Sequence, residues 1–325
     1  MTAPSVASSP AVPLDPVARE LRDALTRLPR TLPPRWLYDD RGSELFSQIT
    51  GLDEYYQTEA EREILEASST AIAEITEATT VIELGSGTSD KTRSLLDAFV
   101  VHGLIERFVP LDVSEQTLLD AAEMLGERHP GIVVEPVVGD FTRHLGRLRD
   151  VGGSGPRLVV FLGGTIGNFY VDERRAFLGA LADALRPGDW LLVGIDQVKP
   201  IDRLIAAYDD QEGVTEAFIR NALVHVNTEY DGDLDVGAFG YVPLWDARQE
   251  RIDMRLRAEV PVTARFDGLD LDLELSVGEE IRVEISSKFR PEELVDELGR
   301  AGFDDRPRVF TDDRDDFAVI LAQKT

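Results

Sequence analysis

Two patterns of apolar residues divide the chain. Between residues 58 and 196, continuous apolar runs alternate with stretches whose apolar residues recur at helical spacing. Such runs are typical of parallel strands covered on both faces, and the stretches between them predict crossover helices. The predicted strands are 81–84, 107–113, 132–138, 158–162 and 189–196. Ligands of such sheets bind beyond the carboxyl ends of the strands, so we expect functional residues directly after them.

After residue 196, apolar and polar residues alternate instead. Two helical stretches lead into alternating strands between about 237 and 288. Alternation indicates one buried and one polar face, as in an antiparallel meander. The α/β pattern then returns, with a helix at 291–301 and strands at 308–311 and 317–321.

The change of pattern predicts two domains and a lead-in. Residues 1–16 are rich in Ala, Pro, Ser and Val and are expected to be disordered. We assign residues 58–196 and 289–325 to the α/β sheet domain. The alternating region interrupts this domain, and we assign residues 17–57 and 197–288 to a second, α+β domain.

A glycine turn follows the first strand of the sheet domain. Gly85 and Gly87 can adopt positive φ angles and let a ligand approach the backbone, and Thr88, Ser89 and Asp90 are candidate caps of the next helix. Asp90 stands where a dinucleotide-binding turn has its third glycine, and its carboxylate would repel a pyrophosphate. The turn resembles the first motif of class I methyltransferases, whose Rossmann-like sheet is parallel with one antiparallel strand. Alone, it equally fits a plain strand-to-helix turn.

Acidic residues follow the next two strands. Asp112 ends the second strand, where a carboxylate can accept hydrogen bonds from both hydroxyls of a ribose. Asp140 and Phe141 follow the third strand, where they can bind the amino group of adenine and stack on its ring. Each of these residues alone also fits an ordinary turn or core position. Together with the glycine turn they indicate an adenosyl ligand, and we predict S-adenosylmethionine as methyl donor.

Composition narrows the range of partners. The chain has 325 residues, 34 basic and 61 acidic, for a formal charge of −27. Although this charge also suits a merely well-solvated surface, it disfavours nucleic acid and anionic membranes and favours a small-molecule substrate. The chain has no cysteine, and its four histidines lack metal-ligand spacing, so we predict no metal site. With no long apolar run and no signal peptide, we expect a cytoplasmic protein, and we take it as a monomer.

Nearly end to end, the chain resembles the histidine-specific N-alpha-methyltransferases of ergothioneine biosynthesis. Enzymes of that family trimethylate the amino group of free histidine to give hercynine, and they join a Rossmann-like methyltransferase domain to a substrate domain. The segments that carry the resemblance are 32–39, 54–56, 83–89, 165–168, 207–210 and 288–291.

The resemblance implies the residues of both binding sites. Asn168 and Tyr208 would hold the carboxylate of the substrate, and Tyr38 and Asn168 would act in catalysis by orienting its nitrogen or relaying a proton through water. No general base is assigned. The implied cofactor-binding residues are Gly85, Ser86, Gly87, Lys91, Asp112, Asp140 and Phe141. The implied substrate-binding residues are Tyr38, Tyr55, Gly163, Asn168, Tyr208, Met254, Glu284 and Ser286. To these we add Phe46, whose aromatic face could favour the growing cation of the product.

Several of these residues have a plainer interpretation without the family. Glu284 and Ser286 project from one face of a predicted strand, and unaided they are a solvated polar face; the resemblance makes them, with Tyr55, the imidazole-binding residues. Met254 shares an apolar face with its strand neighbours and unaided belongs to the core. Lys91 unaided is a solvated lysine in the first turn of a helix.

Three other functions stay open from the sequence. The chain could be an N-methyltransferase for tryptophan or tyrosine, although Glu284 with Met254 favours histidine. It could bind S-adenosylmethionine without catalysis. A nicotinamide oxidoreductase is disfavoured by Asp90.

Overall fold

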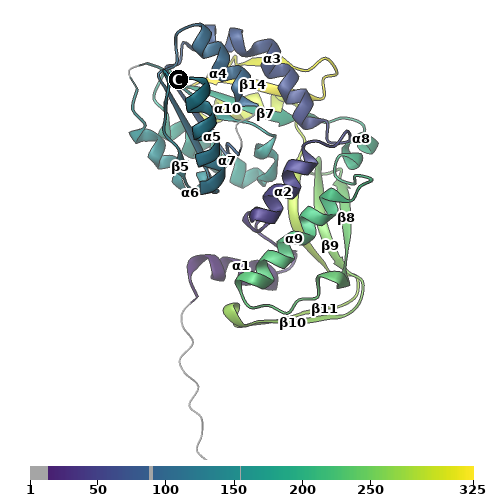
Figure 1. Ribbon diagram of the computed structural model, residues 1–325. Coiled ribbons are helices and arrows are strands. Elements are labelled where there is room, and N and C mark those ends of the chain that lie inside the picture. Colours follow the sequence, from purple (N-terminus) through teal and green to yellow (C-terminus); the bar gives the residue numbers. More distant parts are fainter. Residues whose placement is uncertain (1–13, 88–90, 154) are drawn as a thin grey trace, which may run out of the picture. The chain divides into compact units, whose positions relative to one another are not determined.

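The computed structural model describes residues 14–87, 91–153 and 155–325, which divide into two compact units (Figure 1). The first unit, described from residue 14, contains the segments up to Gln48, Gln211–Leu244 and Asp253–Glu284. The second unit contains Ile49–Asp210, Trp245–Ile252 and Ile285–Thr325.

The second unit is built on an eight-stranded sheet with the order β13-β14-β7-β6-β2-β3-β4, in which β5 also pairs with β3. Strand β14 is antiparallel to both of its neighbours, and the other pairs are parallel. The predicted fold class, a parallel sheet with one antiparallel strand, is therefore confirmed. The strands are β2 (Thr80–Leu84), β3 (Arg107–Asp112), β4 (Val133–Val134), β5 (Val137–Val138), β6 (Arg157–Phe161), β7 (Trp190–Asp196), β13 (Arg308–Thr311) and β14 (Phe317–Gln323).

One predicted strand of this sheet is interrupted. The sequence predicts a single strand at 132–138, whereas the structure has two short strands, β4 and β5, separated by Glu135 and Pro136. Pro136 has no backbone N–H to donate to the β-ladder, which accounts for the break.

Helices cover both faces of this sheet. The helices of this unit are α3 (Gln57–Thr76), α4 (Thr92–Val101), α5 (Glu115–Arg128), α6 (Phe141–His144), α7 (Val171–Ala184), α8 (Ile201–Ala206) and α10 (Pro291–Ala301), with short 3₁₀ turns η2 (Leu145–Asp150) and η3 (Thr165–Asn168). Pro291 at the first position of α10 and Gly302 just after it, at φ 99°, account for the bounds of that helix.

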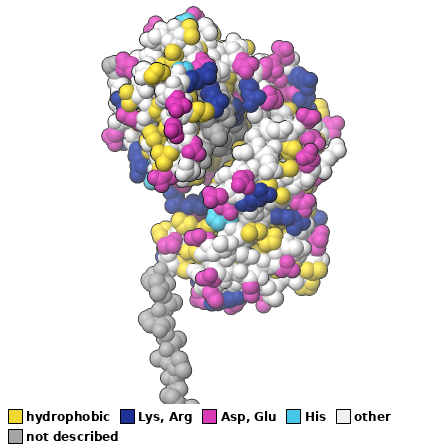
Figure 2. Space-filling model, in the orientation of Figure 1, with side chains coloured by type: hydrophobic (Ala, Val, Ile, Leu, Met, Phe, Trp, Pro, Cys, Tyr) yellow, Lys and Arg dark blue, Asp and Glu magenta, His cyan; other side chains and the backbone are white. Residues whose placement is uncertain are grey.

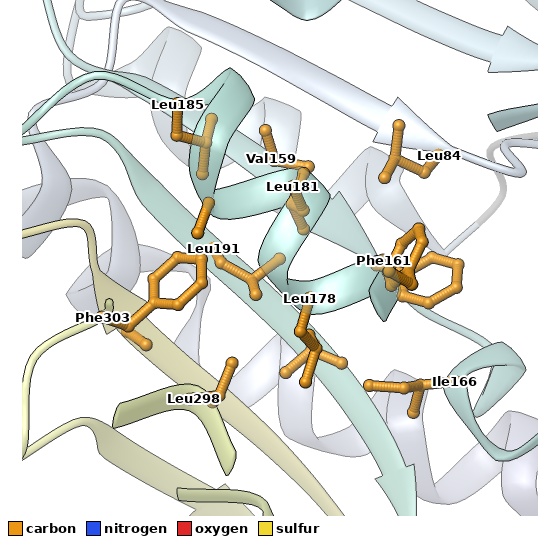
Figure 3. Close-up of a cluster of buried hydrophobic side chains, with 14 of the residues drawn as sticks. Leu84, Val159, Phe161, Ile166, Leu178, Leu181, Leu185, Leu191, Leu298 and Phe303 are labelled. Atoms are coloured by element: carbon orange, nitrogen blue, oxygen red, sulfur yellow. The ribbon is translucent and has the colours of Figure 1, made fainter. Parts of the chain in front are cut away.

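Successive strand residues enter two different cores. Val81 and Leu158 pack with α3 and α4, whereas Ile82 and Val159 pack with α7 and α10. Figure 3 shows the second core, in which Leu178 and Leu181 of α7 lie beside strand residues. Because both faces are covered, most strand residues are apolar, which explains the continuous runs in the sequence.

The first unit combines helices with two small sheets. One sheet has the order β1-β12-β9-β8, and β10 and β11 form a separate antiparallel pair. The elements are α1 (Pro16–Thr26), β1 (Arg30–Thr31), η1 (Pro34–Leu37), α2 (Asp40–Ile49), α9 (Val214–Glu229), η4 (Val236–Ala238), β8 (Phe239–Asp246), β9 (Arg251–Ala258), β10 (Val262–Phe266), η5 (Asp267–Leu269), β11 (Leu271–Leu275) and β12 (Glu280–Ser287). The ends of α2, β8, β9 and β12 belong to the second unit.

The predicted meander is wrong in its order. Strands β10 and β11 leave the main sheet, and β1 joins it parallel to β12, with Arg30 opposite Ile281. The separate pair keeps the expected alternation, because Leu271, Leu273 and Leu275 are buried and the residues between them are exposed. The solvated face that Glu284 and Ser286 would form without the family resemblance is not found, since every residue from Val283 to Ser287 is buried.

Two expectations concern residues that begin helices. Of the predicted lead-in, residues 1–13 lie outside the described part, and Pro16 belongs to α1, whose first turn Asp15 caps. The candidate caps at residues 88–90 also lie outside it, and α4 begins at Thr92.

Figure 2 shows acidic side chains spread among basic ones on the face it presents. No helix in the described residues is long and apolar enough to span a bilayer.

Candidate active site

The glycine turn after β2 is tied to the end of β3. Gly85 and Gly87 have φ angles of 68° and 48°. The Gly85 N–H donates to the carbonyl oxygen of Leu111 at 2.8 Å, and the Gly87 N–H donates to Oδ2 of Asp112 at 2.9 Å. A Cβ atom on Gly85 would lie 3.3 Å from the Phe141 ring, so the turn leaves its backbone open beside an aromatic edge.

The carboxylate of Asp112 can accept more hydrogen bonds than its backbone contacts use. Its Oδ1 accepts from the Ser114 N–H at 3.1 Å, so each carboxylate oxygen accepts one backbone N–H in the described part of the chain. A carboxylate can accept further hydrogen bonds at both oxygens, which suits the two hydroxyls of a ribose. Ser86 lies between the two glycines, and its Oγ is buried with no partner among the described residues. An adenosyl ligand therefore fits this turn.

Phe141 and Asp140 lie at the start of α6. The Phe141 ring is partly buried and packs edge-on against Phe161, with centroids 5.4 Å apart. Asp140 caps its own helix by accepting from the Thr142 N–H at 2.9 Å. An adenine amino group would have to share this carboxylate with Thr142.

Lys91 and Gly163 meet at a residue that the sequence analysis missed. Glu61 of α3 is fully buried, and its Oε2 lies 2.5 Å from Nζ of Lys91. Both oxygens of Glu61 also lie 2.9 Å from the Gly163 N–H. Lys91 is therefore held in an ion pair, with 26% of its side chain accessible. An available signal was the acidic residue on the helix face that carries Ile64 and Leu65.

Asp196, the last residue of β7, is the centre of a buried polar group that we call the Asp196 cluster. Its carboxylate accepts from Tyr56 Oη at 2.8 Å and Gln57 Nε2 at 3.3 Å, and pairs with Lys288 Nζ at 2.7 Å and with Lys199. The members are Tyr56, Gln57, Asp196, Lys199, Tyr208, Ser286 and Lys288.

The protonation states in the Asp196 cluster follow from burial and charge. Burial would raise the pKa of Asp196, but Lys288 and Lys199 outweigh it and hold that pKa below its ordinary value. Burial and the nearby Asp196 carboxylate raise the pKa of Tyr56. Tyr56 therefore stays protonated and serves as a hydrogen-bond donor to Asp196, so it is a poor general base.

The Asp196 cluster contains predicted substrate-binding residues. Tyr208 Oη lies 2.7 Å from Ser286 Oγ, and Lys288 Nζ donates to these oxygens at 2.7 and 2.8 Å. The ring of Tyr55 packs edge-on against that of Tyr208, with centroids 6.3 Å apart. The structure thus brings Tyr55, Tyr208 and Ser286 together around Lys288, which the sequence analysis did not select as a binding residue.

Asn168 ends the η3 turn, which packs tightly against the chain just after Ser286. A Cβ atom on Gly167 would lie 2.8 Å from the carbonyl oxygen of Ser287, closer than such atoms approach. Only glycine allows this contact, which sets Asn168 near the end of β12.

We expect Gly167→Ala to disturb substrate binding more than cofactor binding. The added methyl group must push η3 away from Ser287, at a cost of about 1–3 kcal/mol in stability. Calorimetric titration should show weakened histidine binding and unchanged S-adenosylhomocysteine binding. Gly179→Ala on α7, where a Cβ would meet no atom within 4 Å, is the matched control. Equal histidine affinities in the two variants would contradict the role given to this contact.

The remaining predicted substrate residues lie on elements of the first unit. Tyr38 packs edge-on against Phe46 and Phe218, with ring centroids 5.9 and 5.7 Å away. Met254 lies on β9 with 2% of its surface exposed, and Glu284 on the neighbouring strand β12 with 8%. Phe218 of α9 was not singled out in the sequence analysis, although its ring completes this aromatic group.

One of the missed residues of the Asp196 cluster follows a rule that the sequence analysis already used. Asp196 ends the fifth predicted strand just as Asp112 ends the second, so the same strand-end argument applies to it. Lys288 has no such signal, because it comes after a strand that looks half-polar in sequence and is wholly buried in the structure.

Comparison with known proteins agrees with this geometry. The model of a family described as histidine-specific, S-adenosylmethionine-dependent methyltransferase matches residues 17–324. The histidine N-alpha-methyltransferase of Mycolicibacterium smegmatis is 48% identical over 304 residues, which are 94% of each chain. That of Mycobacterium tuberculosis is 47% identical over 306 residues, again 94% of each chain. Ergothioneine biosynthesis protein 1 of Schizosaccharomyces pombe is 35% identical over 225 residues, which cover 66% of this chain and 29% of that protein.

The predicted enzyme class and methyl donor are confirmed by these matches, which do not favour the alternatives left open by the sequence. The methyl acceptor in this class is a small molecule, an amino acid. The chain belongs to the family of histidine-specific, S-adenosylmethionine-dependent methyltransferases.

Proposed function

We propose that this protein transfers three methyl groups in succession from S-adenosylmethionine to the α-amino group of free L-histidine. The product is hercynine, and the reaction is the first step of ergothioneine biosynthesis. The observation that carries the proposal is the 48% identity to a histidine N-alpha-methyltransferase over 94% of both chains. The turn at Gly85–Gly87 and the carboxylate of Asp112 support it, because they fit the adenosyl group of the methyl donor.

The cofactor-binding residues position the methyl donor, which supplies an electrophilic methyl group on its sulfonium. Asp112 accepts from the ribose hydroxyls, and Phe141 packs against the adenine beside Gly85. Ser86 contributes its buried hydroxyl. Lys91, held by Glu61, neutralises the carboxylate of the methyl donor.

The substrate-binding residues orient the amine. Asn168 holds the carboxylate of histidine, and Glu284 and Ser286 bind its imidazole together with Tyr55. Tyr208, to which the resemblance gives the same role as Asn168, has its hydroxyl engaged with Lys288, Gln57 and Ser286, so it lines the space around the substrate with Gly163 and Met254. Tyr38 and Asn168 direct the nitrogen toward the methyl group. Each transfer needs a neutral amine, whereas an amino group is largely protonated near neutral pH, so the site must bind or create the neutral form. Positioning of the two reactants in a water-poor site contributes much of the rate. The rings of Tyr38 and Phe46 favour the growing cation by about 1 kcal/mol each.

The proposal extends to the organisation of the protein. Residues 17–57 and 197–288 form the substrate-binding domain, and residues 58–196 and 289–325 bind S-adenosylmethionine. The protein works as a cytoplasmic monomer on a small molecule, without a nucleic acid or membrane partner.

A competition experiment tests the proposed reaction. We expect histidine to gain three methyl groups when the protein is incubated with S-adenosylmethionine and an equimolar mixture of amino acids, followed by mass spectrometry. Tryptophan and tyrosine should stay unmethylated, because only imidazole offers a donor N–H and a bare acceptor nitrogen on two separate ring atoms for Glu284 and Ser286. Indole has a donor alone, and the phenol has its donor and acceptor on a single oxygen outside the ring. Methylation of another amino acid would overturn the assignment to histidine. Binding of S-adenosylmethionine without its consumption would overturn the assignment as an enzyme.

A further inference from the structure

Lys288 makes contacts that set the hydrogen-bond polarity of the Asp196 cluster. Its Nζ is fully buried and is shared among Asp196 Oδ2, Tyr208 Oη and Ser286 Oγ, at 2.7, 2.7 and 2.8 Å. An ammonium group has three donors and no acceptor. Both hydroxyl oxygens must therefore accept a proton from Lys288, and their own protons must point elsewhere.

The position of each hydroxyl proton follows from the remaining contacts. Tyr208 Oη also accepts from Gln57 Nε2 at 3.2 Å, so donors occupy both of its lone pairs. The orientation of the Gln57 amide is set by Asp196, since only the NH₂ end can face a carboxylate. In the 2.7 Å contact with Ser286, Tyr208 must be the donor. Ser286 Oγ then accepts from Lys288 and Tyr208 and directs its own proton out of this group of contacts.

We propose that Lys288 is a positioning residue that makes Ser286 a hydrogen-bond donor, so that the protein selects histidine whose ring has an unprotonated nitrogen. The inference rests on the proposed function, in which Ser286 binds the imidazole. A neutral imidazole has one bare nitrogen that can accept the Ser286 proton, whereas the imidazolium ring has two N–H groups and none that can accept. The ring of histidine loses its proton near pH 6.5, so the bound form should predominate above that pH.

Other titratable groups lie near Lys288 and Ser286, and their protonation could also make histidine binding depend on pH. In the described residues these are Asp196 and Lys199 at the end of β7, Tyr56 before α3 and Tyr208 after α8, with Glu284 preceding Ser286 on β12. Lys199 pairs with the same carboxylate and bonds to Tyr56 at 2.6 Å. Lys199 Nζ donates to Tyr56, Asp196 and the carbonyl oxygen of Asp316, and not to the hydroxyls of Tyr208 or Ser286. Lys199→Met therefore removes a positive charge beside the same carboxylate, as Lys288→Met does, and it is the matched control.

The test compares histidine binding at two pH values in the presence of S-adenosylhomocysteine, by calorimetric titration. The neutral ring is about ten times more abundant at pH 7.5 than at pH 5.5, so wild-type affinity should fall about tenfold between them. In Lys288→Met the Ser286 oxygen regains a lone pair and can accept from imidazolium. We expect affinity at pH 7.5 to fall at least tenfold and the ratio between the two pH values to shrink below threefold. Lys199→Met should keep the wild-type ratio.

A second variant tests the inference independently, in case Lys288→Met does not fold. Ser286→Ala removes the donor without changing charge, and its pH ratio should also fall below threefold. S-adenosylhomocysteine affinity without histidine reports whether each variant keeps its cofactor site. A tenfold ratio in Ser286→Ala, or in folded Lys288→Met, overturns the inference while leaving the proposed function standing. Absence of histidine binding by the wild-type protein at pH 7.5 overturns the proposed function and the inference with it.

Discussion

Asp112→Ala is expected to lower the affinity for S-adenosylmethionine about hundredfold, or about 2.8 kcal/mol. The substitution removes the acceptor proposed for two ribose hydroxyls, and hydrogen bonds to charged groups contribute about 1.5–3 kcal/mol each. It also releases the N–H groups of Gly87 and Ser114, which loosens the turn. Calorimetric titration with S-adenosylhomocysteine measures the loss directly.

Glu115→Ala is the matched control for this substitution. Glu115 is exposed at the start of α5, three residues after Asp112. Its substitution by alanine removes the same negative charge. We expect less than a threefold change in affinity. If both variants bind S-adenosylhomocysteine equally well, Asp112 does not hold the ribose, and the cofactor site has to be placed elsewhere.

Arg157→Met is expected to lower the free energy of unfolding by about 3–5 kcal/mol. Arg157 begins β6 and is completely buried. Its Nε donates to Asp189 at 2.9 Å, and its Nη groups donate to the carbonyl oxygens of Leu148 and Ala184. Without the guanidinium, Asp189 is a buried carboxylate with only backbone partners, and two carbonyl groups lose their donor. Urea unfolding of the variant measures this change.

The control for Arg157→Met is an exposed arginine. Arg27 pairs with Asp23 at 3.1 Å, and 78% of its side chain is accessible. Exposed ion pairs contribute about 0–1 kcal/mol, so Arg27→Met should hardly alter unfolding. A loss below about 1 kcal/mol in Arg157→Met would show that the site relaxes or admits water, and that this ion pair does not hold β6 to the start of β7.

The sequence predicted the sheet unit better than the other unit because the two depend on different interactions. Strands covered on both faces are apolar at most positions, and the sequence shows this directly as continuous apolar runs. The pairing of β1 with β12 joins segments that are distant in the chain, and no local pattern encodes such a contact. The separation of β10 and β11 from the main sheet likewise depends on which edges meet.

The cofactor half of the site was easier to predict than the substrate half. Gly85, Asp112 and Asp140 each follow a strand, and the ends of neighbouring parallel strands meet at one edge of a sheet. Glu61 and Lys288 come from a helix and from the end of a buried strand, and their charges are paired only after folding. Sequence alone offers a solvated interpretation for such residues, because exposure is what charged side chains usually have.

The linear order of residues was enough for the family, the methyl donor and the strand-end residues, because these depend on local spacing and on residue type. Folding was needed to show that Tyr55, Tyr208 and Ser286 gather around Lys288, and that Asp196 keeps that lysine in place. The physical reason is that a hydrogen-bond direction is set by all the donors and acceptors around an atom, and these come from four separate segments of the chain.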